Sequence, residues 1–381
     1  MHILEIPSFF TPYGGEFCLE QAKALKALGN EVRILSNVQL GITIGGKDFM
    51  VFPSCRFWQE RDGVEVYQTY QRGVPKMLRH NVTNWIKIVR SMFEDYIGKY
   101  GKPDILHAHC AKWAGYAAML ISRQYGIPYV ITEHLSKMLL EREFGKAPST
   151  AWQIPLLKEA YENANMVIPV SEELVDDVAC YYGKNYKYTP VSNMIDVDFF
   201  AYRERQKGVN DSFSLACIAN AEYHKGYDVL LPAFSKLLES GVKAELHIAG
   251  RGTDSRSFRK KLPEGVISHG LIDKHAVRNL LYRSHALVLA SRSEVQPLVL
   301  LEAMCTGIPV ISTECIPQSL RLEGGCTIVP IDDVDALAAA MKQVMLSKDF
   351  DGKALSEIIS QRVSGNAIAF KLMQLFSEIV S

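Results

Sequence analysis

Short apolar segments alternate along this sequence with longer stretches whose apolar residues recur at helical spacing. In the first half of the chain, the segments of strand length and composition are 2–6, 31–36, 64–70, 104–109, 129–134 and 166–170. A helical stretch, 16–29, follows the first of them and ends at Gly29. Alternation of this kind predicts an α/β fold, with parallel strands in a sheet and helices on both faces.

The second half of the chain repeats this alternation. Its expected strands are 213–219, 244–250, 265–270, 286–290, 309–313 and 326–330, and helical stretches such as 225–241 and 273–284 lie between them. The intervening stretch, 193–212, is polar and charged, as is typical of a domain connection. A chain of 381 residues also exceeds what one hydrophobic core usually serves. We therefore expect two doubly wound, Rossmann-like parallel-sheet domains, 1–195 and 196–364.

Composition narrows the classes of function. Lys and Arg together number 42, as do Asp and Glu, so the formal net charge is zero and a nucleic-acid partner is not expected. An anionic ligand must then be held locally, by a few cations and backbone N–H groups. The eight cysteines are scattered without a Cys-x-x-Cys pair, which favours reduced thiols in a cytoplasmic protein. No apolar run is long enough to span a bilayer.

Candidate site residues follow the expected strands. In open parallel sheets, ligands bind outside the carboxyl ends of the strands. The residues at these positions are Tyr13, Gly14, Gly15, His109, Glu133, His134, Asn220 to Lys225, Gly250 to Gly252, and Ser291 to Glu294. If the two sheets face each other, these residues would line one cleft. His107 is expected to be structural and to point to the opposite face of its strand from His109.

The segment 291–311, SRSEVQPLVLLEAMCTGIPVI, carries two glutamates that need an explanation. Pro297 and Gly307 predict a helix from about Pro297 to Thr306, and its apolar residues surround it, so the helix should be buried. A buried Glu302 must find partners, either ligand hydroxyls or backbone amides, because an unpaired buried carboxylate is costly. Glu294, in the loop before the helix, either caps the chain locally or lies near N–H groups that suit a phosphate.

The segment 291–311 resembles the E-x7-E region of the retaining glycosyltransferases of family 4, which have the two-domain GT-B fold. Other motifs occur in the family's order: PYGG at 12–15, PDILHAH at 103–109, SNMIDVDFF at 192–200, HKGYDVLLPAF at 224–234 and LHIAGRG at 246–252. The resemblance spans nearly the whole chain. It also implies that a last helix, about 365–381, packs back against the first domain.

The resemblance implies a role for each matching residue. Glu294 would contact the donor sugar, Glu302 would bind the ribose hydroxyls, and Lys225 would hold the donor diphosphate. His109 would lie over the sugar as a catalytic group together with Glu294 and Lys225. Gly15, without a Cβ, would let backbone N–H groups approach the phosphate or the acceptor. The remaining donor-binding residues would be Asn220, Gly250, Arg251, Leu298 and Val299, and the acceptor-binding residues Tyr13, Gly14 and His134.

Three features depart from the family pattern, the first of which is Met194 in place of the usual glycine after Asn193. Asn220 stands where members usually carry an arginine, so a second cation for the diphosphate must come from elsewhere, with Arg251, Arg292 and His224 as candidates. The sequence EVQP at 294–297 replaces the commoner Glu-Gly-Phe-Gly, in the loop expected to touch the sugar. The identity of the sugar therefore does not follow from the family.

Three further patterns have weaker interpretations. Asp196-x-Asp198 and Asp333-x-Asp335 have the Asp-x-Asp form of some metal sites, but Asp333 suits a helix cap, and the resemblance implies metal-independent chemistry. Ser255 stands where a nicotinamide fingerprint beginning at Gly250 needs glycine, so we reject that reading. The basic, apolar stretch 76–100 predicts a long helix that either packs on the sheet or contacts an anionic membrane as a peripheral protein does.

The sequence therefore predicts a cytoplasmic, retaining glycosyltransferase. Its co-substrate would be a nucleotide-diphosphate sugar of the UDP or GDP type, with no cofactor and no metal. Its acceptor would be a glycan or a lipid-linked glycan of surface polysaccharide biosynthesis. The alternatives are a nucleotide-sugar 2-epimerase, a sugar phosphorylase, and a non-catalytic subunit that binds nucleotide sugars.

Overall fold

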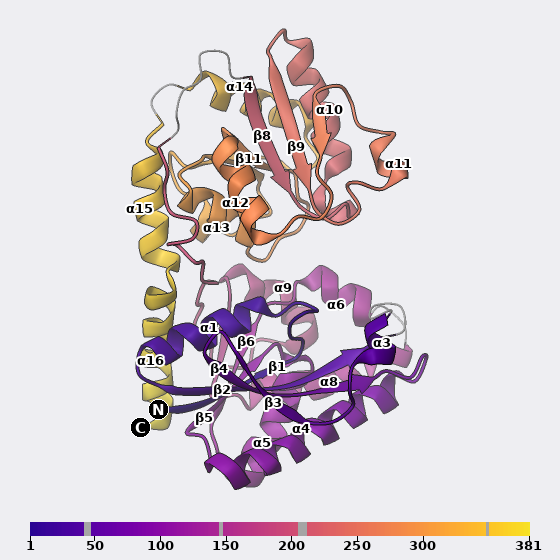
Figure 1. The fold of residues 1–381 in the computed structure, drawn as a ribbon, viewed down its shortest axis with the longest axis vertical. Coiled ribbons are helices and arrows are strands. Elements are labelled where there is room, and N and C mark those ends of the chain that lie inside the picture. The colour runs from indigo at the N-terminus through magenta and orange to yellow at the C-terminus, as the bar shows by residue number, and fades with distance from the viewer. Residues whose placement is uncertain (42–46, 145–147, 205–211, 348–349) are drawn as a thin grey trace. The chain divides into compact units, whose positions relative to one another are not determined.

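The computed structural model describes residues 1–41, 47–144, 148–204, 212–347 and 350–381, shown as ribbons in Figure 1. The chain forms two compact units. The first comprises Met1–Met194 together with Gly365–Ser381, and the second comprises Ile195–Ser364. Each unit contains its own predominantly parallel sheet with helices on both faces, which confirms the expected α/β, Rossmann-like architecture.

The sheet of the first unit has seven strands in the order β3-β4-β2-β1-β5-β6-β7. The strands are β1 His2–Pro7, β2 Glu31–Leu40, β3 Phe57–Arg61, β4 Val64–Arg72, β5 Ile105–His109, β6 Tyr129–Glu133 and β7 Met166–Pro169. All neighbouring pairs are parallel except β3 with β4. The antiparallel pair turns at Asp62 and Gly63, which both have positive φ, as a two-residue hairpin requires.

Helices cover both faces of this sheet (Figure 1). They are α1 Glu16–Ala27, α3 Lys47–Val51, α4 Leu78–Tyr100, η1 Ala111–Gly115, α5 Tyr116–Tyr125, α6 Lys137–Phe144, α7 Pro148–Ala151, α8 Gln153–Glu162, α9 Glu173–Tyr182 and α16 Gly365–Val380. The last of these packs on α1 and contributes Ile368, Leu372 and Phe376 to the core of the first unit.

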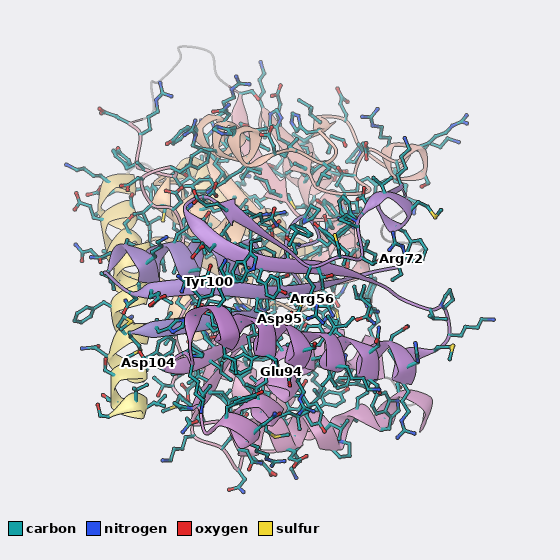
Figure 2. All side chains as sticks on the ribbon, turned by 60° about the horizontal axis from the view of Figure 1, so that its bottom comes forward. Arg56, Arg72, Glu94, Asp95, Tyr100 and Asp104 are labelled. Atoms are coloured by element: carbon teal, nitrogen blue, oxygen red, sulfur yellow. The ribbon has the colours of Figure 1, made fainter. Side chains whose placement is uncertain are left out.

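The long helix α4 packs on the sheet through one apolar face. That face buries Val82, Val89 and Phe93, and the indole N–H of Trp85 donates a 2.8 Å hydrogen bond to the carbonyl of Asn37 in β2. Asp95, on the same helix, accepts from Tyr67 of β4 and pairs with Arg56, just before β3 (Figure 2). The packing interpretation of the stretch 76–100 is thus confirmed. Within the described ranges, no helix is both long and apolar enough to cross a membrane.

The sheet of the second unit is wholly parallel, with the strand order β10-β9-β8-β11-β12-β13. Its strands are β8 Phe213–Ile218, β9 Ala244–Ala249, β10 Val266–Ser268, β11 Ala286–Leu289, β12 Val310–Thr313 and β13 Cys326–Val329. Its helices are η2 Tyr223–Lys225, α10 Tyr227–Glu239, α11 Arg256–Arg259, α12 Lys274–Arg283, α13 Leu298–Cys305, η3 Gln318–Leu320, α14 Val334–Leu346 and α15 Gly352–Val363. Separate apolar clusters, one built around α10 and α14 and the other around α13 and α15, complete its core.

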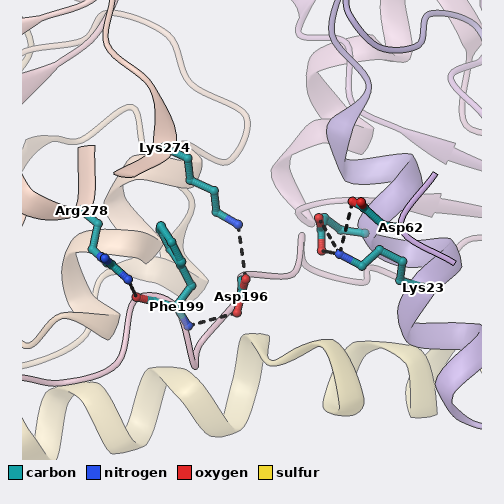
Figure 3. A network of polar contacts seen from close by, with 7 residues as sticks. Lys23, Asp62, Asp196, Phe199, Lys274 and Arg278 are labelled. Carbon is teal, nitrogen blue, oxygen red and sulfur yellow. Dashed lines mark hydrogen bonds and ion pairs between the residues drawn. The ribbon is translucent and has the colours of Figure 1, made fainter. Parts of the chain in front are cut away.

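The first aspartate of each Asp-x-Asp sequence accepts a hydrogen bond from a nearby backbone amide in the second unit. Asp196 accepts a hydrogen bond from the amide of Phe199 and pairs with Lys274 at 3.4 Å (Figure 3). Asp333 caps α14 by accepting from the amide of Ala336 at 2.8 Å. The contact of Asp333 confirms the capping interpretation made for that residue.

Candidate active site

The strand order defines one preferred ligand position in each unit. In the second unit the chain runs outward through β8, β9 and β10, then returns to β11 on the other side of β8. In the first unit the same reversal separates β1 from β5. Crevices form at such switch points, outside the carboxyl ends of the two strands concerned. The loops after β8 and β11, and those after β1 and β5, contain Lys225, Glu294, Gly15 and the strand-end residue His109.

In the second unit, Lys225 and Glu294 meet at this position. The Lys225 Nζ donates a 2.7 Å hydrogen bond to Oε1 of Glu294, and the hydroxyl of Ser291 donates to the same oxygen at 2.7 Å. The side chain of Glu294 is only 8% exposed and that of Lys225 is 21% exposed. A partly exposed lysine can bind an anion, and a buried carboxylate next to it can accept hydrogen bonds from hydroxyl groups.

A glycine explains why Lys225 lies so close to the loop after β11. Gly226 has a φ of 67°, and a Cβ there would clash with the carbonyl oxygen of Ala290. The turn of η2 therefore packs directly on the end of β11, which only glycine permits at low cost.

Arg292 ties these two loops together and is not a free cation. Its guanidinium donates two hydrogen bonds to Asp228, of 2.9 and 2.7 Å, and a third of 2.6 Å to the carbonyl of Tyr223. It also forms an ion pair with Asp332 and lies 4.1 Å from the centre of the Tyr223 ring. Two carboxylates compensate its charge, so Arg292 is a poor substitute for the arginine that the family carries at the position of Asn220.

Asn220 has a structural contact of its own. Its side-chain oxygen accepts a 3.0 Å hydrogen bond from the amide of Arg251, which joins the loops after β8 and β9. Gly250, with a φ of 140°, is required there because a Cβ would clash with the carbonyl of Ala219. The side chain of Arg251 is exposed and, in the part of the chain that the structure describes, forms no ion pair. The role of Arg251 as a second cation beside Lys225 stays a prediction.

Glu302 is an isolated carboxylate on α13. The helix begins after Pro297 and is followed by Gly307 with a φ of 83°, which confirms the predicted limits to within a residue at either end. Leu300, Leu301, Ala303, Met304 and Cys305 of this helix are buried, whereas Leu298 is exposed and Val299 is partly buried. Burial raises the pKa of Glu302 to about 7, with Lys274 acting in the opposite direction. Among the described residues, no group donates a hydrogen bond to this carboxylate or pairs with it, so backbone amides do not satisfy it.

Leu298 and Val299 occupy the first two positions of α13. Backbone N–H groups at these positions have no acceptor within a helix. The two residues therefore offer amide donors, not side-chain chemistry, at the end of the loop after β11, which neighbours the strand β8 whose following loop contains Lys225.

In the first unit, His109 belongs to a buried cluster that the sequence did not predict. Glu5 of β1 lies in register with His107 of β5, and its carboxylate binds both histidines. Oε2 of Glu5 is 2.7 Å from Nε2 of His109 and 3.0 Å from Nδ1 of His107. Burial alone would raise the pKa of Glu5, but His107 and the hydrogen bonds from both rings outweigh it and lower the pKa to about 2.

The prediction that His107 points away from His109 is wrong. Residues two apart in a strand share a face, and here the two ring centres are 4.5 Å apart. Nε2 of His107 is also 2.7 Å from the hydroxyl of Thr132 in β6. A sequence signal for this cluster was the charged residue Glu5 between the apolar residues Leu4 and Ile6.

His134 lies beside His109 on the next strand end. The Phe17 ring of α1 is 3.9 Å from the His134 ring and 5.6 Å from the His109 ring, centre to centre. Burial lowers the pKa of both histidines. Glu133 supports this region from beneath, because its carboxylate accepts hydrogen bonds from the amides of Ala111, His134 and Leu135 and from the Tyr161 hydroxyl.

The glycine loop after β1 has its own geometry. Gly14 and Gly15 have φ values of 97° and 81°, and Gly15 precedes the first residue of α1. A Cβ at Gly15 would clash with the carbonyl of Phe9, so its lack of a side chain is explained by packing within the loop. The hydroxyl of Tyr13 donates to Asp48 of α3. The acceptor-binding role expected for Tyr13 and Gly14 stays a prediction.

Two family models match this chain. One, described as Glycosyltransferase Family 4, matches residues 14–199, and the other, described as Glycosyl transferases group 1, matches residues 212–347. Together they span most of both units.

Two curated relatives are also glycosyl-transferring enzymes by name. The putative teichuronic acid biosynthesis glycosyltransferase TuaC of Bacillus subtilis is 26% identical over 323 residues, which are 81% of this chain and 78% of that protein. A glycogen synthase of Mycobacterium tuberculosis is 26% identical over 257 residues, which are 64% of this chain and 60% of that protein.

Solved structures show the same fold at lower sequence identity. Sucrose-phosphate synthase from Thermosynechococcus elongatus has a TM-score of 0.78 at 17% identity and covers 100% of this chain and 99% of its own. Anabaena HepE in complex with UDP has a TM-score of 0.71 at 15% identity, with coverage of 99% and 100%. With its two Rossmann-like units, its ordered motifs and these matches, the chain belongs to the glycosyltransferases of family 4, which have the GT-B fold.

Proposed function

We propose that this protein is a retaining glycosyltransferase that moves a hexose or N-acetylhexosamine from a nucleotide-diphosphate sugar to a glycan or lipid-linked acceptor. The observation that carries the proposal is the unpaired carboxylate of Glu302, half-sheltered in an apolar helix beside the switch point of the second unit. A vicinal diol, such as that of a ribose, would give this carboxylate two O–H donors at once. Such a partner would relieve the cost of burying it.

The neighbouring groups suit the rest of such a donor, of the UDP or GDP type. Lys225 would turn from Glu294 to the diphosphate, and the first amides of α13 together with Arg251 would contribute further positive potential. Glu294, freed from Lys225 but still held by Ser291, would accept hydrogen bonds from sugar hydroxyls. Charge stabilisation would come from these residues, without a metal ion.

The proposed chemistry is displacement on the front face of the sugar. The bond between the anomeric carbon and the diphosphate oxygen breaks, and the acceptor oxygen bonds to the same face, so configuration is retained. The leaving diphosphate takes the proton of the acceptor hydroxyl. The protein contributes positioning, through Glu294 and His109, and stabilises charge on the leaving group through Lys225.

The acceptor is proposed from two kinds of support. Relatives named as putative glycosyltransferases of teichuronic acid and colanic acid biosynthesis support polysaccharide biosynthesis as the setting. The outer side of α4 and the turn before it also expose Lys76, Met77, Arg79 and Lys87, a combination that suits contact with anionic lipids. A lipid-linked acceptor would be presented at such a surface.

A non-catalytic subunit that binds nucleotide sugars is the second candidate. The observation in its favour is Asn220, whose side-chain oxygen is engaged by the amide of Arg251 where the family usually supplies a cation. Such a protein would bind a donor without turning it over.

A turnover assay separates these functions. The purified protein is incubated with UDP-, GDP- and ADP-sugars, with and without a lipid-linked oligosaccharide pool, and products are examined by NMR for the anomeric configuration of the new bond. Acceptor-dependent release of nucleoside diphosphate with retained configuration supports the proposal. Epimerised free sugar without acceptor indicates a 2-epimerase, phosphate dependence without nucleotide indicates a phosphorylase, and binding without turnover indicates the subunit.

A further inference from the structure

We propose that Glu5 is a positioning residue that fixes the ring of His109 with a proton on Nε2 and a bare acceptor nitrogen, Nδ1, so that this site selects a hydroxyl donor and rejects phosphate. The inference rests on the proposed transferase function for its role in turnover. The geometry behind it lies wholly within the first unit, and the proton position can be tested without turnover.

The first step is the contact between the two side chains. Nε2 of His109 lies 2.7 Å from Oε2 of Glu5, and both side chains are essentially inaccessible, at 1% and 0% exposure. Glu5 is ionised at neutral pH because its pKa is held at about 2, and an ionised carboxylate only accepts hydrogen bonds. Nε2 must therefore carry the proton. The pKa of His109 is lowered by burial, so its ring is neutral and Nδ1 has none.

The second step is the fate of Nδ1. This nitrogen is buried, and among the described residues it has no hydrogen-bond partner. A buried polar atom without a partner is costly, so its retention at a strand end beside the switch point calls for an external partner. The rings of Phe17 and His134 lie on this side of the cluster, with centres 5.6 and 6.0 Å from the centre of the His109 ring.

The third step is the chemistry of a bare imidazole nitrogen. It accepts hydrogen bonds and cannot donate them. The ionised oxygens of a nucleotide-sugar diphosphate are acceptors as well, so they could not form a hydrogen bond with Nδ1. A sugar hydroxyl donates to it readily. The opposite tautomer would present an N–H and invert this preference, which is why control of the proton position by Glu5 matters.

The rest of the cluster keeps Glu5 in place. Nδ1 of His107 donates to the same carboxylate from 3.0 Å, and Nε2 of His107 lies 2.7 Å from the Thr132 hydroxyl. Glu5, His107 and His109 also offer ligand atoms within 4.8 Å of one another, a spacing that a metal ion could use. Direct hydrogen bonds already account for each atom that faces Glu5, so we assign a proton network, and metal binding becomes an outcome of the test.

The experiment measures the His109 tautomer directly. Protein labelled with ¹⁵N-histidine is examined by two-bond ¹H–¹⁵N correlation, with the His109 signals assigned from a His109→Gln variant. We expect a protonated Nε2 and an unprotonated Nδ1 in the wild-type protein, and loss of this preference in Glu5→Gln. A protonated Nδ1 in the wild-type protein would overturn the proposal, as would Zn²⁺ found at one equivalent and shifting the His109 signals. The wild-type measurement shows which nitrogen of His109 is protonated even if Glu5→Gln does not fold.

Kinetics then distinguish positioning from a general loss of structure. With the donor found active in the turnover assay, Glu5→Gln should lower kcat about 100-fold while KM for the donor changes less than about threefold, since the nucleotide is bound elsewhere. Val66→Ala opens a cavity in β4, which β2 and β1 separate from β5; it is the matched control and should lower Tm while keeping kcat. Equal losses of kcat in both variants would contradict a positioning role. Absent turnover with an intact tautomer would count against the transferase, not against the pairing of Glu5 with His109.

Discussion

Lys225 and Glu294, 69 residues apart in the sequence, form a 2.7 Å hydrogen-bonded ion pair at the switch point of the second unit. The glycine turn at 226 and the Arg292 bonds to Tyr223 and Asp228 hold their two loops together. This pair keeps a lysine and a carboxylate ready at the position where a nucleotide sugar would be cleaved.

Replacing Lys225 tests its proposed role toward the diphosphate. Lys225→Ala should lower kcat about 100- to 1,000-fold, because a placed cation that stabilises a leaving group typically contributes that much. The measurement is steady-state release of nucleoside diphosphate. Lys236→Ala is the control, since that exposed lysine of α10 pairs with Asp335 and should leave turnover unchanged. Full activity of Lys225→Ala would contradict the proposed site.

The raised pKa of Glu302 predicts a pH-dependent stability. Its pKa is about 7 when folded against an ordinary value near 4.5, so between these pH values the folded state binds more protons than the unfolded state. The contribution of Glu302 to stability is therefore present below about pH 4.5 and is lost as the pH rises to about 7, by up to about 3 kcal/mol.

Glu302→Gln removes this titration. Its free energy of unfolding, measured with urea between pH 5 and pH 8, should increase relative to wild type as the pH rises. Parallel pH profiles for the two proteins would show that Glu302 titrates normally. The same variant should bind donor more weakly if the carboxylate holds a diol.

Gly226 and Gly29 provide a matched pair of glycines with positive φ. Alanine at either position costs about 1 to 2 kcal/mol for the left-handed backbone. At Gly29 the added methyl group would meet open space, whereas at Gly226 it would meet the carbonyl of Ala290. Gly226→Ala should thus lower Tm clearly more than Gly29→Ala and should also reduce turnover. Equal Tm losses would mean that the η2 turn is not packed as described.

Arg251 is expected to supply part of the charge that Asn220 lacks. Arg251→Ala should weaken donor binding about tenfold, the scale of one charge-assisted hydrogen bond, with a smaller effect on kcat. Isothermal titration with the active nucleotide sugar measures this directly. Arg259→Ala, at the end of the short helix α11, serves as control. Unchanged affinity in Arg251→Ala would leave Lys225 as the main cation for the diphosphate.

Local patterns in the sequence were sufficient to predict the two-unit architecture and the ends of α13. Pro297 and Gly307 mark the ends of α13 because capping depends on residues next to the helix. The alternation of strands and helices predicted the doubly wound units for the same reason. The strand β3 was missed although Asp62-Gly63 is a hairpin signal, since Glu60 and Arg61 obscure the apolar pattern at the edge of the sheet.

Long-range pairing explains what the sequence could not show. Glu5 and His109 are 104 residues apart, and their contact depends on the register of β1 with β5. The bond from the Arg251 amide to Asn220 likewise depends on two loops meeting at neighbouring strand ends. The ligand-binding role of Gly15 stays a prediction, and the carbonyl of Phe9 gives a separate, structural reason why this position has no side chain. Such roles follow from tertiary neighbours, which composition and spacing do not reveal.

Donor binding is the most direct test of the central claim. Thermal unfolding of the wild-type protein and of Glu302→Ala is recorded with UDP-, GDP- and ADP-sugars at millimolar concentration, where a ligand at 100 times its Kd stabilises by about 2.7 kcal/mol. We predict that at least one nucleotide sugar raises the Tm of the wild-type protein by several degrees and that Glu302→Ala loses most of this shift. No shift with any of these sugars, or an equal shift in Glu302→Ala, would contradict the account.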